Sequence, residues 1–224
     1  MTAEIKGIEK SYGKKSVLRG VSFSAERGDA VAIIGGNGRG KSTLLKCLAG
    51  ILRPDAGSFM WEGAELLRSR ELKSLVSYVP QGTPLIEELS ARDNLRLWYS
   101  RGEMELSLEK GLLRDLGIGE FLKTRASRLS IGMRKRLTIA CAIARDPQII
   151  LLDEPTASLD IAARERLWQF FDAHCARGGV MILVTHELRD IERSSKTLIL
   201  RNGLAEEYNF SGDYTALAEA MEWS

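Results

Sequence analysis

The stretch Asp29-Ala-Val-Ala-Ile-Ile-Gly-Gly-Asn-Gly-Arg-Gly-Lys-Ser-Thr-Leu-Leu-Lys-Cys-Leu-Ala-Gly50 decides how this chain folds. Its apolar run at residues 31–34 is typical of a buried parallel strand. A glycine-rich loop follows, after which apolar residues recur at helical spacing: Leu44, Leu45, Leu48 and Ile51. Residues 35–42, Gly-x-x-x-x-Gly-Lys-Ser, therefore fit the pattern of a phosphate-binding loop between a strand and a helix.

The composition of this loop explains how it would hold a phosphate chain. Without Cβ atoms, successive backbone N–H groups can turn toward one phosphate chain, and the next helix adds its positive dipole end. Lys41 would place its charge on the β- and γ-phosphates, and the Ser42 hydroxyl would complete a Mg²⁺ shell. The alternative is a plain glycine-rich turn.

Length and composition indicate one globular domain over residues 1–224. Hydrophobic residues make up 44% of the chain and charged residues 28%, which excludes a disordered chain. The 32 basic and 30 acidic residues leave a net charge of +2, so the charge balance favours no particular partner. The basic run Arg134-Lys135-Arg136 is local, and no nucleic-acid partner is expected.

Cysteine and histidine usage exclude two kinds of site. Cys47, Cys141 and Cys175 are far apart and form no Cys-x-x-Cys, so we interpret them as reduced packing residues of a cytosolic protein. With His174 and His186 as its two histidines, the chain has no histidine-rich metal site. No signal peptide is evident, and no apolar run approaches the roughly 18–20 residues that span a bilayer.

The remaining pattern predicts strands on both sides of a helical insertion. Residues 3–28 alternate in short apolar patterns around Tyr12-Gly13-Lys14, which predicts antiparallel strands. Composition shifts to helix formers broken by glycines from about residue 89 to 129. Further strands are predicted at 58–61, 75–79, 149–152 and 180–184, a hairpin at 198–208, and helices at 130–145, 162–175 and 214–221.

A second chemical signal lies at residues 149–154. The apolar run Ile149-Ile-Leu-Leu152 would deliver Asp153 to the carboxyl edge of a parallel sheet, where such sheets bind ligands. A carboxylate there can hold the water shell of Mg²⁺, and Glu154 can point at an attacking water. A strand that simply ends in a polar turn is the alternative.

Taken together, these residues resemble the nucleotide-binding domain of ABC transporters over nearly the whole chain. The matching segments are residues 35–43 (Walker A), Tyr78-Val-Pro-Gln81 (Q-loop), Leu129-Ser-Ile-Gly-Met133 (signature motif), Ile149-Ile-Leu-Leu-Asp-Glu-Pro155 (Walker B), Ser158-Leu159-Asp160 (D-loop) and Val184-Thr-His186 (switch histidine). The resemblance implies the α/β fold of ABC-type P-loop NTPases. This fold has a mostly parallel core sheet, an N-terminal antiparallel β-subdomain and a helical subdomain inserted at about residues 83–129.

The resemblance also implies roles for single residues. Tyr12 would stack on adenine, Gln81 would contact Mg²⁺ and the attacking water, Glu154 would be the catalytic base, and His186 would bond the γ-phosphate. Each has a structural alternative: a packing tyrosine, a polar loop residue, a strand-end carboxylate and a strand-end histidine. The implied ATP-binding residues are Tyr12, Gly35, Gly36, Asn37, Gly38, Arg39, Gly40, Lys41, Ser42, Thr43, Ser130, Gly132 and Asp160; those for Mg²⁺ are Ser42, Gln81 and Asp153; the catalytic ones are Lys41, Gln81, Glu154 and His186.

The signature motif implies a dimer. In the family, its serine and glycine amides contact the γ-phosphate bound by the other subunit, and Ser130 and Gly132 precede a predicted helix as this requires. A plain helix cap is the alternative. Ile131 and Met133 depart from the usual glycine and glutamine. The Gly-Met ending before Arg134-Lys135-Arg136 resembles subunits of drug and antibiotic exporters.

The leading hypothesis is an ATPase subunit of a membrane exporter, which forms a homodimer on the cytoplasmic face of the membrane and binds a separate membrane-spanning subunit. Residues 83–98 would form the groove for a helix of that subunit, with Trp98 and Tyr99 as anchors or as plain core. The alternatives are a soluble non-transport ABC-type ATPase and a small-molecule kinase with a phosphate-binding loop. Neither the substrate nor the direction of transport follows from the sequence.

Overall fold

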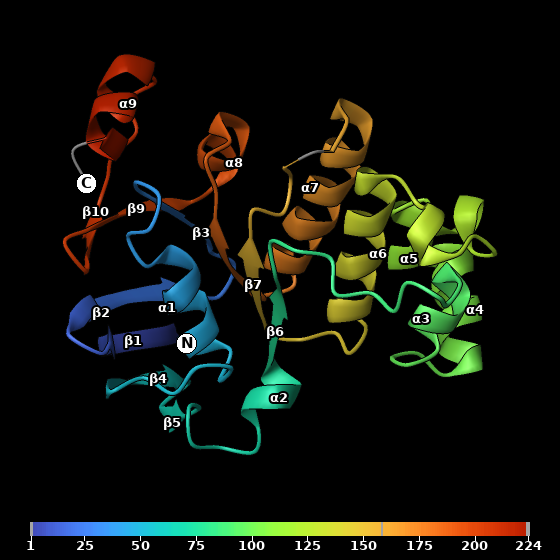
Figure 1. Ribbon diagram of the computed structural model, residues 1–224, viewed down its shortest axis with the longest axis horizontal. Coiled ribbons are helices and arrows are strands. Elements are labelled where there is room, and N and C mark those ends of the chain that lie inside the picture. Colours follow the sequence, from blue (N-terminus) through green and yellow to red (C-terminus); the bar gives the residue numbers. More distant parts are fainter. Residues whose placement is uncertain (1, 158, 223–224) are drawn as a thin grey trace.

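The structure, a computed structural model, describes residues 2–157 and 159–222. Figure 1 shows an antiparallel sheet at one side of the molecule and a block of helices at the other. The antiparallel sheet has the order β2-β1-β4-β5, and a larger sheet has the order β10-β9-β3-β8-β7-β6. The strands are β1 (Thr2–Tyr12), β2 (Lys15–Glu26), β3 (Ala30–Ile34), β4 (Ala56–Trp61), β5 (Ala64–Glu65), β6 (Val76–Val79), β7 (Ile149–Asp153), β8 (Val180–Val184), β9 (Lys196–Arg201) and β10 (Leu204–Glu207).

Helices connect the strands of the larger sheet and cover its faces. This sheet is parallel from β9 to β6, and β10 pairs antiparallel with β9. The helices are α1 (Lys41–Leu48), α2 (Leu72–Leu75), α3 (Ala91–Leu95), α4 (Arg101–Lys110), α5 (Leu112–Asp115), α6 (Ile131–Ala142), α7 (Ile161–Ala176), α8 (Leu188–Arg193) and α9 (Tyr214–Glu222), with short 3₁₀ turns η1 (Ile118–Phe121) and η2 (Ala126–Arg128).

The parallel strands are buried because apolar layers pack against both of their faces. Every residue of β3, β7 and β8 is buried, as expected for strands with both faces covered. On one face, Val31 and Leu151 pack with α1 and the antiparallel sheet. On the other, Ala32 and Leu152 pack with α6, α7 and the helical block. The carboxyl ends of these strands are thereby held at one edge.

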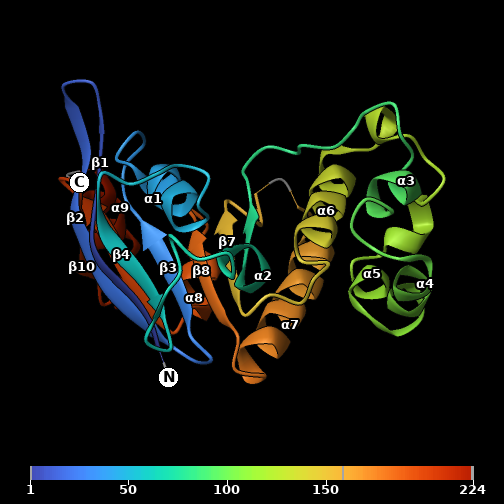
Figure 2. The ribbon, with the colours of Figure 1, turned by 90° about the horizontal axis from the view of Figure 1, so that it is seen from below.

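The helical block fills the chain between β6 and α6. Figure 2 shows α3, α4 and α5 standing apart from the sheets, with α6 and α7 in between. Together with η1 and η2 these helices occupy residues 91–128, within the predicted insertion at about 83–129. Whether that insertion is a subdomain stays a prediction. Among the described residues no helix has the length and apolarity needed to cross a membrane.

Several boundaries differ from the sequence-based prediction, and two of these differences have a local cause. The strand expected from Leu75 begins at Val76, because residues 72–75 form the single turn α2. The helix expected to reach about Arg145 ends at Ala142. Pro147 disfavours a helical residue before it, and Asp146 adopts a left-handed φ of 47°. Ser158 of the expected D-loop lies outside the described residues.

Candidate functional site

One cavity of about 540 Å³ lies at the carboxyl edge of β3, β7 and β8. The loop that leaves β3 enters α1 there, and Asp153 and Glu154 arrive from β7 while His186 follows β8. Most residues that the sequence singled out come together here. The lining residues are Val17, Asn37, Gly38, Gly40, Lys41, Ser42, Thr43, Gln81, Asp153, Glu154, Ala157, Val184 and His186.

Lys41 supplies a buried positive charge to this cavity. Its ammonium group donates to the carbonyl oxygens of Gly35 at 2.5 Å and Gly36 at 3.0 Å. Burial lowers the pKa of Lys41, while the carboxylates of Glu154 and Asp153 oppose this shift. A partly desolvated ammonium at the first residue of a helix attracts an anion, because the helix end adds its own partial positive charge.

The loop needs glycine at two positions for steric reasons. Gly40 has a φ of 103°, and a Cβ atom there would lie 2.7 Å from Cγ1 of Val17. Gly35 has a φ of 137°, and a Cβ atom there would lie 2.7 Å from the carbonyl oxygen of Leu200. Larger residues would strain both positions and push the loop away from the strand that supports it.

Glu154 is a partly buried carboxyl group next to His186. Nε2 of His186 lies 3.4 Å from Oε1 of Glu154. Burial raises the pKa of Glu154 to about 7, and Asp153 and Asp190 add to this effect; the His186 main-chain N–H and Lys41 oppose it. Burial, and to a lesser extent Lys41, lowers the pKa of His186. A carboxyl group that titrates near neutrality is suited to accept a proton from water.

Asp153, Ser42 and Gln81 fit a Mg²⁺ ion that is bound together with phosphates. Asp153 is buried and accepts a hydrogen bond from the Tyr78 hydroxyl at 3.2 Å. No group of three or more His, Cys, Asp or Glu residues in the described part of the chain could hold a metal ion. Mg²⁺ is typically held by one or two carboxylates, with phosphates and water completing its shell. The carboxylate, hydroxyl and amide oxygens of these three residues suit that arrangement.

Tyr12 and Arg39 lie outside this cavity. Tyr12 ends β1, pairs with Lys15 across the hairpin and is half-exposed. Arg39 lines a neighbouring cavity of about 550 Å³, together with Lys14, Lys15 and Arg19. The two cavities share Val17, Asn37 and Gly38, so the basic cavity continues the phosphate loop on its outer side.

Ser130, Gly132 and Asp160 also lie away from this cavity, at helix N-termini. Ser130 caps α6 and accepts a hydrogen bond from the Met133 N–H at 3.2 Å. Asp160 caps α7 in the same way, through the Ala163 N–H at 2.8 Å. Each cap is followed by an exposed isoleucine, Ile131 at 70% and Ile161 at 77% exposure.

Asp190 is a residue that sequence reasoning missed. Its carboxylate is 0% exposed and accepts three hydrogen bonds, from Thr156 Oγ1 at 2.6 Å, Thr185 Oγ1 at 2.8 Å and Trp168 Nε1 at 2.8 Å. Thr156 lies two residues after Glu154, and Thr185 directly precedes His186. A single aspartate in a polar stretch gives no signal in the sequence, because its partners come from other elements.

Lys135 was also missed, since the basic run was considered only as a possible nucleic-acid contact. The structure buries Lys135 and Arg136. Burial lowers the pKa of Lys135 to about 8, and the carboxylates of Asp153 and Glu154 oppose this shift.

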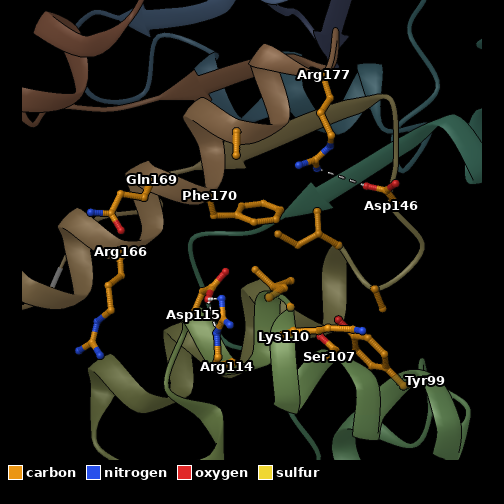
Figure 3. A pocket seen from close by; sticks show the side chains of 15 residues that line it. Tyr99, Ser107, Lys110, Arg114, Asp115, Asp146, Arg166, Gln169, Phe170 and Arg177 are labelled. Atoms are coloured by element: carbon orange, nitrogen blue, oxygen red, sulfur yellow. Dashed lines mark hydrogen bonds and ion pairs between the residues drawn. The ribbon is translucent and has the colours of Figure 1, made fainter.

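A second, larger cavity of about 620 Å³ lies between α5, the end of α6 and α7 (Figure 3). Its two acidic side chains already face arginines: Asp115 lies 2.7 Å from Arg114, and Asp146 lies 3.8 Å from Arg177. None of the residues predicted for ATP, Mg²⁺ or catalysis is among those that line it. The larger cavity thus has neither the phosphate loop nor a free pair of carboxylates, so the smaller cavity is the candidate site.

Comparison with known proteins agrees with this geometry. The family profile described as "ABC transporter" matches residues 18–157. Nod factor export ATP-binding protein I of Burkholderia orbicola (strain AU 1054) is 36% identical over 197 residues, which cover 85% of this chain and 64% of that protein. Lantibiotic transport ATP-binding protein SrtF of Streptococcus pyogenes is 33% identical over 189 residues, covering 84% of this chain and 82% of that protein. The chain thus spans less than two thirds of the Nod factor relative.

A solved structure shares the fold. It is a dimeric ATP-binding cassette in a post-hydrolysis state, bound to ADP and Pi, and it superposes on this chain with a TM-score of 0.82 at 27% identity. The match covers 95% of this chain and all of that one. The fold class expected from the sequence is confirmed.

Proposed function

Because this chain belongs to the ABC transporter family, we propose that it binds and hydrolyses ATP as the energising subunit of a membrane exporter. One observation carries the proposal: a single cavity joins the Lys41 loop to Glu154 and His186, whose side chains lie 3.4 Å apart. Phosphate-binding groups and a candidate base for water are thus in one place. The names of both relatives refer to export or transport.

In this proposal the cavity holds the triphosphate of ATP. The loop amides and Lys41 bind the phosphates, and Ser42, Asp153 and Gln81 hold Mg²⁺, which would neutralise charge on the β- and γ-phosphates. Glu154 accepts a proton from the attacking water, and His186 donates a hydrogen bond to the γ-phosphate. Tyr12 stacks on adenine from the end of β1, beyond the basic cavity lined by Arg39.

The proposed active form is a homodimer. Ser130, Gly132 and Asp160 lie outside the cavity of their own subunit, at exposed helix N-termini. Such ends bind anions, so they are free to serve a nucleotide bound by a second copy. The dimer of the solved ATP-binding cassette supports this arrangement. ATP would favour the closed dimer because it binds both halves at once.

A separate membrane-spanning subunit is the second proposed partner, at the cytoplasmic face of the membrane. Between residues 83 and 98 three large apolar side chains are exposed, Ile86, Leu97 and Trp98. These side chains would contact a helix of the membrane subunit. Tyr99, by contrast, is buried, and its hydroxyl donates to the carbonyl oxygen of Ala140 at 3.1 Å, which favours the core alternative for that residue.

The test is Glu154→Gln, which keeps the size of the side chain but removes its capacity to accept a proton. We expect ATP binding to persist and a nucleotide-dependent dimer to accumulate, while the ATPase rate falls by about a hundredfold or more. Glu192→Gln, at an exposed carboxylate that accepts from the Tyr214 hydroxyl, is the matched control and should hydrolyse normally. Steady ATPase activity of Glu154→Gln would overturn the role of Glu154. Phosphoryl transfer to a metabolite in place of water would indicate a kinase.

A further inference from the structure

Lys135 is a buried cation in the helix that begins after Ser130. It is 4% exposed, and its ammonium group donates to the main-chain carbonyl oxygens of Pro80 at 3.1 Å, Gln81 at 3.5 Å and Asp153 at 3.3 Å. An ammonium group has three N–H donors and no acceptor. These three carbonyls therefore use its full hydrogen-bonding capacity.

The three acceptors belong to two segments that carry proposed Mg²⁺ ligands, Gln81 and Asp153. Pro80 and Gln81 follow β6, and Asp153 ends β7. Lys135 itself belongs to α6, whose first turn holds Gly132. One side chain thus connects the phosphate-facing edge of the sheet to the helix that would serve the other subunit.

The two neighbouring cations make no such connection. Arg134 pairs with Glu87 at 2.7 Å, and Arg136 donates to the carbonyl oxygen of Leu116 at 2.8 Å. Both of these partners lie within the helical insertion. Of the three cations in the run, Lys135 is the one whose hydrogen bonds reach the sheet.

We propose that Lys135 is a positioning residue that couples the two nucleotide sites of the dimer, by fixing α6 to the main chain at Gln81 and Asp153. A shift of these carbonyls in one site then moves Ser130 and Gly132 at the other. The connection is stiff because a buried ammonium group that leaves its acceptors stays unsatisfied in a low-dielectric interior. Coupling of this kind acts in both directions. This inference rests on the proposed function, in which Ser130 and Gly132 contact the partner's nucleotide.

The first experiment separates binding from turnover. Lys135→Met keeps an unbranched side chain but removes all three donors. We expect the ATP affinity of the isolated subunit to stay within about twofold and kcat to fall by about tenfold or more. Lys135→Gln keeps an amide donor, so its kcat should lie between those of Lys135→Met and the unchanged protein. If Lys135→Met does not fold, Lys135→Gln takes its place in the experiment. Arg136→Met, which removes a similarly buried cation of the same helix, should lower stability and leave kcat within about twofold.

Mixed dimers decide whether the effect crosses the interface. One subunit carries Glu154→Gln together with Lys135→Met, and the other is unchanged. Only the unchanged subunit can then hydrolyse ATP, at a site completed by the α6 of the variant subunit. We expect its rate to be about tenfold lower than in a control dimer whose first subunit carries Glu154→Gln alone.

Equal rates in these two mixed dimers would overturn the proposal, because Lys135 would then serve only the site of its own subunit. The control dimer tests the premise separately. If it neither forms with ATP nor hydrolyses it, the proposed function fails, and this inference fails with it.

Discussion

Asp190 joins the ends of two strands that carry the proposed reacting groups. Oδ2 accepts from both threonine hydroxyls, Thr156 after β7 and Thr185 at the end of β8, while Oδ1 accepts from Trp168 of α7. The buried carboxylate is stabilised here because all three of its side-chain partners donate hydrogen bonds to it. Asp190 thereby fixes the distance between the segments of Glu154 and His186.

Asp190→Asn should separate this positioning role from simple stability. In either orientation of the amide, at least one of the three donors loses its acceptor, so we expect a loss of about 1–3 kcal/mol in the free energy of unfolding. We also expect kcat to fall by about tenfold while the affinity for ATP changes little, since Lys41 and its loop are untouched. Urea unfolding and steady-state ATPase kinetics measure these changes.

Asp172→Asn provides the matched control. Asp172 is an exposed aspartate that pairs with Arg193 at 2.7 Å. Removing a surface ion pair changes stability by about 1 kcal/mol or less. An Asp190→Asn variant that is destabilised but keeps its full kcat would show that Asp190 has only a structural role.

The raised pKa of Glu154 predicts how the stability of the fold depends on pH. Its folded-state pKa is raised from 4.5 to about 7, chiefly by burial, with Asp153 and Asp190 adding to the shift and Lys41 and the His186 N–H opposing it. Between these two values the unfolded chain has already lost the proton that the folded chain retains, so stability falls as pH rises through this window. Above about pH 7 the full penalty is present.

Glu154→Gln removes that penalty. In the absence of nucleotide and Mg²⁺ we expect the variant to be more stable than the unchanged protein at pH 8, by roughly 1–3 kcal/mol, with the difference shrinking toward pH 5. Thermal unfolding of both proteins across this range measures it. His186, whose pKa is lowered, contributes the opposite slope, and because its Nε2 lies 3.4 Å from Oε1 of Glu154, its contribution differs between the two proteins; at pH 8 it is neutral both folded and unfolded, so the comparison is made there. Equal melting temperatures of the two proteins at pH 8 would show that burial does not destabilise the ionised form of Glu154.

At the scale of elements, local chemistry explains which predictions were confirmed. The strand–loop–helix at β3 and α1, the antiparallel pair β1 and β2, and the cap of α6 by Ser130 depend on short-range patterns, which a sequence displays. The helices α2, of four residues, and α8, of six, are too short to show a period and were not predicted from the sequence. The end of α6 was predicted at about Arg145, three residues too late, because Pro147 disfavours helical residues before it and the helix ends at Ala142.

Site residues divide in the same way. Lys41, Ser42, Asp153 and Glu154 were predicted because each follows a buried strand at the carboxyl edge of a parallel sheet, and the structure brings all four to one cavity. Asp190 and Lys135 escaped because their partners are separated from them by up to 34 and 55 residues, respectively. What a buried charge does depends on which carbonyls and hydroxyls the tertiary fold brings to it, and no local pattern contains that information.

At the scale of the whole molecule, the helix N-termini that carry predicted site residues lie in two kinds of place. The end of α1 faces the cavity at Lys41, whereas the ends of α6 and α7 lie outside it. The N-termini of α6 and α7 each expose an isoleucine in a single subunit: Ile131 and Ile161 are among its most exposed large hydrophobic residues. A second copy would cover both.

The double variant Ile131→Ser, Ile161→Ser tests that assembly, in the Glu154→Gln background where the dimer is expected to persist. The isolated subunit should unfold at nearly the same temperature, because both side chains are already in water. Dimerisation with ATP should weaken by about a thousandfold or more, since burying one isoleucine contributes about 1.5–3 kcal/mol and twofold symmetry doubles each of the two changes. Sedimentation velocity over a range of protein concentrations measures the fractions of monomer and dimer.

Leu204→Ser, at an exposed leucine of β10, is the control and should leave the dimer unchanged. If the double variant dimerises as tightly as its parent, the N-terminal ends of α6 and α7 do not form the interface, and Ser130 cannot reach a partner's nucleotide.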